Sequence, residues 1–498
     1  MKRQTKTLIA VLGVFVLLCG ALAAVLLTDP GEGTEETSEA ESEPESISLV
    51  AREYAELVSV SVQGVGELYA VGTGDATTEI PALSGLPVNA GSLAYIAKYA
   101  TTMTAQREID ASAGLEEFGL ADNSGTPVVT VKYTDGAEVT LRIGDEVPAA
   151  SPSSNYVLFD GKVYTMYHAH LKYFLMEPKE YLDTDITPTS SDSSTGNYLY
   201  ELVSMTVGGR RLEEPFIVYA AGAEDDSSAS VFTADVISAG GEIYPMASDT
   251  CLKLIYSPFD LDAADIVSYF STDEDLAACG LDDPWATVDL QATYVGDGTG
   301  EEKPVHFKLL ASEPDADGRV CVMIEGVPVI YAIDEPTGDS WYRADYRDYV
   351  SSYMLMPSVS DVDELSLETP DGDFVFGIQH GEAGSFLTAD AWSSYPGTPS
   401  SAVLSDAATF SAFYETLVGA ENDGWAEVPA DTELVSVLKV TYRYADGEDT
   451  LEFFEGPARQ NYVAVNGTVH FVIRSSYTES VIAAASALMT GSGASESS

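Results

Sequence analysis

The chain has 498 residues, of which 45% are hydrophobic, so it can bury sizeable cores and is not a wholly disordered protein. Its formal net charge of −57 repels the phosphates of DNA and RNA, which makes it unsuited to binding nucleic acid, and it also disfavours anionic lipid surfaces. At this length we expect about three domains of ordinary size.

The N-terminus combines a basic cluster with a long uncharged run. Three basic residues occur first, namely Lys2, Arg3 and Lys6. The twenty apolar residues 8–27 that follow are long enough to cross a membrane as a helix, whereas a cleavable signal peptide usually has a shorter apolar core. Because basic residues stay on the cytoplasmic side, we expect a cytoplasmic stub at residues 1–6, an uncleaved transmembrane anchor at 7–28 and an exported remainder.

Cys19 lies within the predicted anchor and suggests an alternative to it. The alternatives to an uncleaved anchor are a lipid attached to Cys19 and a cleaved signal peptide. However, Leu18 stands where a lipid-attachment motif has a small residue, and the apolar run continues past Cys19. Three further cysteines follow, Cys251, Cys279 and Cys321. An odd number cannot all pair within one chain and no Cys-x-x-Cys occurs, so buried free thiols are the simplest expectation.

Three segments have the composition of connecting or terminal chain. Residues 29–47 are acidic, rich in Ser, Pro and Gly, and without aromatic residues, which predicts a disordered stalk. Residues 184–197 are rich in Ser, Thr and Asp and predict a linker, and residues 489–498 predict a disordered tail.

Between these segments the sequence repeats itself. Alternating stretches that begin at Glu56, Glu201 and Asp363 each predict a half-buried strand, followed by a turn and a second strand. A helical stretch comes next, clear in the first and third copies and less regular in the second. The first helix is expected to bury Leu93, Ile96, Ala100 and Met103, with Asn89 or Ser92 as its cap, and the third to bury Phe410, Phe413 and Leu417, with Ser405 as its cap.

A pair of hairpins follows each helix. The first hairpin has Asp135-Gly136 or Asp446-Gly447 at its tip, and such a dipeptide between alternating strands predicts a tight primed turn. The second hairpin carries nearly the same phrase at residues 155–166 and 461–472. Its tips in the three copies are Asp160-Gly161, Glu325-Gly326 and Asn466-Gly467, and the middle copy contains one extra residue.

These signals predict an α+β fold of three tandem repeats behind one N-terminal transmembrane helix. Each repeat is expected to contain a strand hairpin, a helix and a four-stranded antiparallel meander, closed by a short helix. Repeat unit 1 is predicted at residues 48–183, repeat unit 2 at 198–357 and repeat unit 3 at 358–488.

The repeated motif resembles a known family. Gly119-Leu120, the Gly-Leu-Asp-Asp-Pro sequence of residues 280–284 and the hairpin glycines are similar to the bacterial family called domain of unknown function 4340. The resemblance implies a repeat-containing, membrane-anchored protein, often encoded beside ABC-2 type transporters of the gliding-motility kind. These motif residues are structural positions, so the resemblance assigns no catalytic residue.

Motifs that suggest chemistry each have a plainer interpretation. Residues 313–318, Glu-Pro-Asp-Ala-Asp-Gly, resemble the start of a calcium loop, but Ile324 stands where a bidentate Glu is needed, which favours an acidic hairpin tip. His168 and His170 would share a face of a strand and could hold one metal, but no third ligand is evident nearby, so surface histidines are favoured.

Three further patterns are weak. Ser436 and Lys439 have the Ser-x-x-Lys spacing of penicillin-binding enzymes, but their segment alternates as a strand. The Asn466-Gly467-Thr468 glycosylation sequon coincides with a predicted turn. Three tryptophans could stack on sugars, but packing is their commoner role: Trp341, Trp392 and Trp425.

The sequence thus predicts a protein that acts by binding. We expect no catalytic, cofactor-binding or metal-binding residue and no enzymatic activity. The expected partner is an envelope protein, with an ABC-type transporter or its cargo foremost, and the membrane is reached through the N-terminal helix. The alternatives are a cell-surface binder of a small molecule, polysaccharide or cation, and an enzyme of a type that these motifs do not reveal.

Overall fold

The computed structural model describes most of the chain beyond residue 45. The described residues are 46–63, 68–71, 78–112, 114–122, 125–220, 235–247, 251–296, 302–491 and 494–495. The predicted stub, anchor and nearly all of the stalk lie outside them. Among the described residues no helix is long and apolar enough to cross a membrane.

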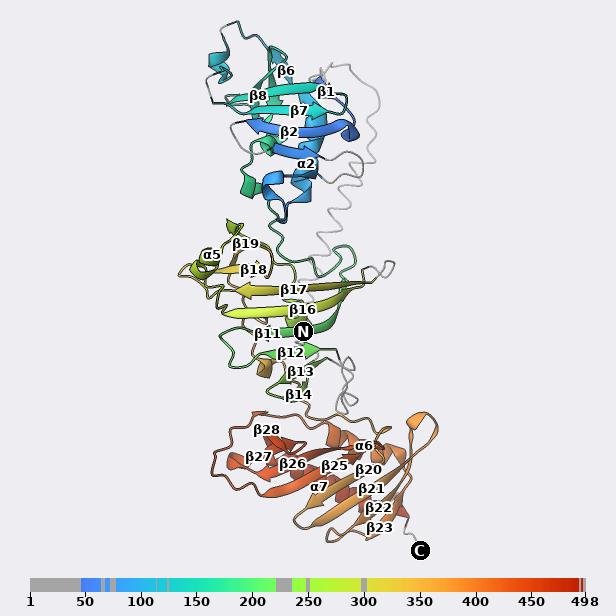
Figure 1. Ribbon diagram of the computed structural model, residues 1–498. Helices are drawn as coiled ribbons and strands as arrows, with labels where there is room; N and C mark the ends of the chain where they lie inside the picture. The colour runs from blue at the N-terminus through green and yellow to red at the C-terminus, as the bar shows by residue number, and fades with distance from the viewer. Residues whose placement is uncertain are drawn as a thin grey trace, which may run out of the picture. The chain divides into compact units, whose positions relative to one another are not determined.

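The described chain is mostly β-sheet with few helices, arranged in four sheets (Figure 1). The described residues fall into two compact units: those of unit 1 lie within Met1–Val65, Val71–Thr77 and Tyr95–Leu175, and those of unit 2 within Gly66–Ala70, Thr78–Ala94 and Met176–Ser498. The smallest sheet pairs β1 (Ile47–Ala51) with β5 (Thr102–Ala105).

Sheet 1 has eight strands in the order β4-β3-β2-β7-β8-β9-β10-β6. Its strands are β2 (Leu57–Gln63), β3 (Leu68–Val71), β4 (Thr78–Glu79), β6 (Arg107–Ile109), β7 (Val128–Tyr133), β8 (Glu138–Glu146), β9 (Ser154–Phe159) and β10 (Lys162–Tyr167). The helical elements of this part are η1 (Tyr54–Glu56), η2 (Pro81–Leu83), α2 (Ala90–Thr101), η3 (Leu115–Phe118), α3 (His168–Leu171), η4 (Lys172–Phe174) and η5 (Pro178–Tyr181).

Sheet 2 has nine strands in the order β14-β13-β12-β11-β16-β17-β18-β19-β15. They are β11 (Tyr200–Gly208), β12 (Phe216–Tyr219), β13 (Val236–Ala239), β14 (Glu242–Pro245), β15 (Asp265–Tyr269), β16 (Ala286–Tyr294), β17 (Lys303–Ala311), β18 (Arg319–Ile324) and β19 (Val329–Asp334). Its helical elements are α4 (Cys251–Tyr256), α5 (Asp273–Ala278) and η7 (Tyr346–Asp348).

Sheet 3 has ten strands in the order β24-β28-β27-β26-β25-β20-β21-β22-β23-β29. They are β20 (Glu364–Thr369), β21 (Gly372–His380), β22 (Phe386–Ser393), β23 (Ser401–Leu404), β24 (Gly424–Trp425), β25 (Ser436–Arg443), β26 (Glu448–Glu455), β27 (Gln460–Val465), β28 (Thr468–Arg474) and β29 (Ala494–Ser495). The helical elements are η8 (Glu382–Gly384), α6 (Ala407–Val418), η9 (Pro457–Arg459) and α7 (Ser475–Thr490).

The three large sheets have the same central pairing pattern. In each, the first strand (β2, β11 or β20) pairs antiparallel with the first strand of the following hairpins (β7, β16 or β25). Three more neighbours then continue the sheet in chain order: β8-β9-β10, β17-β18-β19 or β26-β27-β28. Alternation accounts for the burial, because Val60 and Val62 of β2 and Val129 and Val131 of β7 are all at most 1% exposed.

The predicted helices are present with changed ends. Helix α2 buries Ile96 and Ala100 as expected, and the Asn89 side chain caps it by accepting a hydrogen bond from the Ser92 N–H at 3.0 Å. Met103 is buried too, but as part of β5, so its placement on the helix was wrong.

Helix α6 buries Phe410, Phe413 and Leu417 as expected. Its cap is Asp406 rather than Ser405, because the Asp406 carboxylate accepts from the Ala408 N–H at 3.1 Å. The carboxylate is thereby placed at the positive end of the helix, where a negative charge is favoured.

The turn chemistry differs among the hairpins. Both tip residues have positive φ at Asp160-Gly161 (46° and 76°) and at Asn466-Gly467 (50° and 91°), as a type I′ turn requires. These are tips of second hairpins, and the two first-hairpin tips differ from them: only Gly136 of Asp135-Gly136 has positive φ, and neither residue of Asp446-Gly447 does. The predicted primed turns at these two tips are therefore wrong.

Two predicted connecting segments are held by defined hydrogen bonds. Within residues 184–197, Ile186 is 5% exposed and its N–H donates to the Leu261 carbonyl, while the Ser190 N–H donates to the Asp260 carboxylate. At the C-terminus, α7 extends to Thr490 and β29 pairs with β23, both within or overlapping the segment 489–498.

Candidate functional site

A cluster of aromatic and basic side chains lies in unit 1. Tyr95 and Tyr99 are one turn apart on α2, which places them on the same side of the helix, with Lys98 beside them. Tyr173 of η4 stacks on Tyr95 with ring centroids 4.8 Å apart, and His170 of α3 stacks on Tyr99 at 4.5 Å. Thus two elements about seventy residues apart meet through their rings.

Two lysines contact the stacked rings. The Lys98 ammonium lies 5.6 Å from the Tyr95 ring centroid and 5.5 Å from that of Tyr99, and the Lys172 ammonium lies 4.8 Å from that of Tyr173. These are cation–π distances. Within the described residues neither lysine forms an ion pair with a carboxylate. We call this set the tyrosine–lysine surface: Tyr95, Lys98, Tyr99, His170, Lys172 and Tyr173.

The surface is partly open to solvent. Tyr95 is 40% exposed, both lysines are exposed, and the other three side chains are half-buried. Burial, followed by the nearby tyrosines, raises the pKa of Tyr99, so its hydroxyl remains protonated at neutral pH. Burial, followed by the positive charge of Lys98, lowers the pKa of His170, so its imidazole is neutral there. The positive charge of the surface therefore comes from the two lysines.

The structure separates the two histidines that the sequence placed together. They lie in the short helix α3 rather than on a strand, so residues two apart point to different sides. The Nδ1 atom of His168 contacts the Asn155 side-chain oxygen at 2.9 Å, whereas His170 stacks on Tyr99. Their expected common face was wrong, and each has a packing partner of its own.

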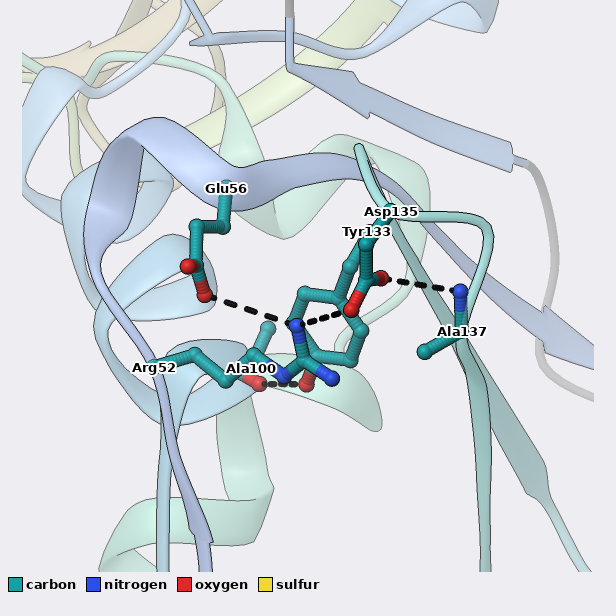
Figure 2. Close-up of polar contacts among 6 residues, drawn as sticks. All are labelled: Arg52, Glu56, Ala100, Tyr133, Asp135 and Ala137. Carbon is teal, nitrogen blue, oxygen red and sulfur yellow. Dashed lines mark hydrogen bonds and ion pairs between the residues drawn. The ribbon is translucent and has the colours of Figure 1, made fainter.

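A second polar cluster is centred on Arg52 (Figure 2). The guanidinium donates to the Asp135 carboxylate at 2.8 Å and lies 3.5 Å from the Glu56 carboxylate. It also lies 4.5 Å from the centroid of the Tyr133 ring. The Tyr133 hydroxyl donates to the Ala100 carbonyl near the end of α2 at 2.8 Å. The cluster thus joins the β7–β8 hairpin tip to α2 and to the start of β2.

The Arg52 cluster is internally paired. The Asp135 carboxylate also accepts from the Ala137 N–H at 2.9 Å, and this bond, followed by the one from Arg52, lowers the pKa of Asp135 (Figure 2). Burial raises the pKa of Tyr133 to about 12. Because the arginine already faces two carboxylates, it has little capacity left for an anionic ligand, and we assign it a structural role.

Two surface depressions lie in the same unit. One, of about 460 Å³, is lined by Glu108, Ile109, Asp110, Ala111, Ser112, Gly161, Lys162 and Val163. The other, of about 310 Å³, is lined by Ala51, Arg52, Glu53, Glu56 and Thr102. In the first, Lys162 and Glu108 form an ion pair at 3.0 Å, so its charged groups are mutually neutralised.

The remaining sequence motifs occupy structural positions. The Asp315 carboxylate accepts from the N–H groups of Asp317 and Arg319 within its own turn, and the described residues contain no group of three or more His, Cys, Asp or Glu placed to hold a metal ion. Ser436 and Lys439 lie on strand β25, as expected. The Asn466 side chain bonds Thr450 and Asp449.

The tryptophans divide by burial. Trp341 is 0% exposed, and Trp425 packs on Phe471 with ring centroids 4.9 Å apart. Trp392 on β22 is 49% exposed. Trp341 and Trp425 therefore have packing roles, which are the commoner ones for tryptophan. Of these three tryptophans, only Trp392 is exposed to solvent.

The sequence patterns did not predict the tyrosine–lysine surface. The spacing of Tyr95, Lys98 and Tyr99 was a usable signal, since it marks one side of a helix whose opposite side buries Ile96 and Ala100. Tyr173 and His170 could not be joined to it, because only the tertiary fold brings their segment beside α2.

Residues 79–196 match the family model described as Domain of unknown function (DUF4340). The match includes α2, α3 and η4, and hence the whole tyrosine–lysine surface. No curated protein and no solved structure matches the chain. The chain therefore carries a DUF4340 domain at residues 79–196.

Proposed function

We propose that this chain is a membrane-anchored, extracytoplasmic protein that acts by binding an envelope protein, foremost a component of an ABC-type transporter. Residues 7–28 serve as the anchor, since an uncharged run follows three basic residues. The three large sheets are three tandem repeats of one α+β unit, each with a hairpin, a helix and a four-stranded meander. Their common strand pairing supports this proposal.

The observation that carries the binding function is the tyrosine–lysine surface. Tyrosine is enriched where protein partners bind tightly, because it supplies a large apolar area and a hydroxyl with little conformational entropy to lose. Here the rings are already stacked, so the surface is ordered before a partner arrives. Its two lysines are exposed on a chain of net charge −57, which makes this face locally favourable to an acidic partner.

A protein partner fits this surface better than a polysaccharide. Sugars bind to aromatic side chains by lying against a free ring face. Each tyrosine here is stacked on a neighbouring ring and also has a lysine ammonium over it. The exposed Tyr95 and the two lysines still present a ring edge, a hydroxyl and ammonium groups, which suit hydrogen bonds and ion pairs with a polar protein face.

The location is tested with intact cells. Protease added outside should degrade the bulk of the chain and leave the N-terminal segment protected. Detergent-lysed cells provide the control for complete cleavage. Full protection of the bulk in intact cells contradicts the exported location.

The binding function is tested by cross-linking and purification from native membranes, with the full chain. We expect a polytopic transporter component to co-purify with the wild type, and its yield to fall at least tenfold with the double variant Tyr95→Ala, Lys98→Glu. Trp392→Ala is the matched control, because Trp392 is 49% exposed but lies on sheet 3. Equal yields from all three proteins would exclude this surface as the binding site.

A further inference from the structure

Two cysteines that are 42 positions apart in the sequence meet beside sheet 2. Cys279 is the C-cap of α5, and Cys321 lies in the middle of β18. Both pack against the same small apolar cluster, formed by Leu281, Met323 and Ile330. The Cys279 thiol also lies near enough to the Cys321 thiol to raise its pKa.

The backbone on both sides holds the pair in place. Cys321 exchanges two hydrogen bonds with Ser312: its N–H donates to the Ser312 hydroxyl at 3.0 Å, and its carbonyl accepts from the Ser312 N–H at 2.9 Å. The Cys279 N–H donates to the Asp275 carbonyl at 3.0 Å, and Gly280 then ends the helix in the left-handed region with φ of 69°. The backbone at both cysteines is therefore fixed by hydrogen bonds of its own.

The surroundings suit a lasting disulfide better than a reactive thiol. Burial, followed by the hydrogen bond with Cys279, raises the pKa of the Cys321 thiol to about 12. A disulfide whose thiolates are poor leaving groups is reduced slowly, whereas catalytic pairs have a stabilised thiolate.

We propose that Cys279 and Cys321 form a structural disulfide that ties α5 to β18. The oxidant in the cell is the disulfide of a thiol-oxidising protein, and in vitro it is glutathione disulfide. Both cysteines are partly exposed, so such an oxidant can reach them. Formation in the cell rests on the exported location proposed above, because disulfides persist in oxidising compartments.

The reaction balances as two thiol–disulfide exchanges. The thiolate of Cys279 attacks one sulfur of the oxidant, which forms a mixed disulfide and releases the first thiolate. The Cys321 sulfur, after losing its proton, then attacks the Cys279 sulfur and releases the second. The two protons pass to the released thiolates, so two cysteines are oxidised and one disulfide of the oxidant is reduced to two thiols.

The test uses the full-length chain in mild detergent, treated with glutathione disulfide and then denatured and labelled with a maleimide. The chain has four cysteines, and we expect labelling to fall from four to two. Peptide mass spectrometry should identify the link between Cys279 and Cys321, lighter by two hydrogens than the reduced peptides. Four labelled thiols after oxidation, or a link that includes Cys251, would overturn the proposal.

Single variants provide the controls. Cys279→Ser and Cys321→Ser should each abolish the link, whereas Cys251→Ser, a change on α4, should leave it intact. Circular dichroism checks that each variant is folded, and Cys279→Ala replaces the serine variant if that one is not. The redox state of the pair in cells, trapped by acid quenching, separates the disulfide proposal from the proposed exported location. A pair that oxidises in vitro but is reduced in cells supports the disulfide site and contradicts the exported location.

Discussion

Asp160 and Asn466 are the residues at which the two copies of the repeated phrase agree most closely. Each adopts positive φ and is followed by a glycine with positive φ. The middle copy departs from this, because Glu325 does not have positive φ although Gly326 does (86°). The extra residue noticed there in the sequence is consistent with its different turn. The first and third copies of this turn therefore agree in backbone conformation as well as in sequence.

This agreement makes a prediction about two glycines. Gly161→Val and Gly467→Val should each destabilise by about 1–2 kcal/mol, because a β-branched side chain is strained in the left-handed region. A Cβ at either position meets nothing within 4 Å, so the cost is conformational rather than steric crowding. Urea melts of the two variants measure it.

A third hairpin glycine supplies the control. Gly447 does not have positive φ, and a Cβ there also meets nothing within 4 Å. Gly447→Val should therefore change stability by less than about 0.5 kcal/mol. Comparable losses at all three glycines would show that turn conformation does not determine the effect.

A second residue-scale prediction concerns pH and His170. Its pKa is lowered in the folded chain, so the folded state disfavours its protonation and the unfolded state does not. The stability that this imidazole contributes is present above its unfolded pKa near 6.5 and is lost as pH falls below it. Between pH 7.5 and 5.5 the wild type should lose more stability than His170→Gln.

Chemical melts at these two pH values measure the difference between the proteins. His470, whose pKa burial also lowers, remains in both and contributes equally to each loss. Parallel losses in the wild type and the variant would contradict the assigned burial of His170.

At the scale of the element, two Gly-Leu pairs illustrate what the sequence could predict. Gly119 and Gly280 both follow a short helical element and have φ of 64° and 69°. The leucines after them, Leu120 and Leu281, are 0% and 2% exposed. The sequence predicts a structural role for this motif, and the structure gives the reason: the glycine ends the helical element and the leucine after it is buried in the core.

The two leucines should therefore respond alike to truncation. Leu120→Ala and Leu281→Ala should each destabilise by about 2–5 kcal/mol, since each removes a fully buried side chain and leaves a cavity. Denaturant unfolding measures both. Leu387→Ala is the control, because Leu387 is 55% exposed and its loss should cost little. A large difference between the first two variants would show that the pairs are not structural equivalents.

Strands were predicted better than the ends of elements. Period-two alternation placed the starts of β2, β11 and β20 within a residue or two, because alternation reflects burial of one sheet face. The predictions failed where one residue decides between local alternatives. Asp406 caps α6 instead of Ser405, and Met103 is buried from a strand rather than from the helix, although its burial was foreseen.

The candidate site was less accessible to sequence reasoning. His168 and His170 were singled out for their spacing, which has meaning only if the segment is a strand, and it is a helix. The contact of His170 with Tyr99 joins elements far apart in the chain, and so does the packing of Cys279 and Cys321 against one apolar cluster. Such pairs depend on how strands and helices pack, and a single sequence does not contain that information.

For the whole molecule, charge is the dominant property. A net charge of −57 causes self-repulsion, which salt screens beyond about 10 Å at 0.1 M. Raising NaCl from low to physiological concentration, or adding millimolar calcium, should raise the Tm of the full chain by a few degrees. An uncharged solute at equal osmolality is the control. A Tm that is unchanged by both ions would mean that the charges are too dispersed to affect stability.

The proposed binding function depends on the tyrosine–lysine surface being the face that contacts the partner. The most direct measurement is photo-cross-linking in intact cells from a photoreactive amino acid at position 95 of the full chain. Position 387, also exposed but on sheet 3, is the matched control. We predict one strong adduct from position 95 that contains a transporter component, that weakens with Lys98→Glu, and that is absent from position 387. Adducts of equal pattern and strength from both positions, or none from position 95, would contradict a binding face at the tyrosine–lysine surface.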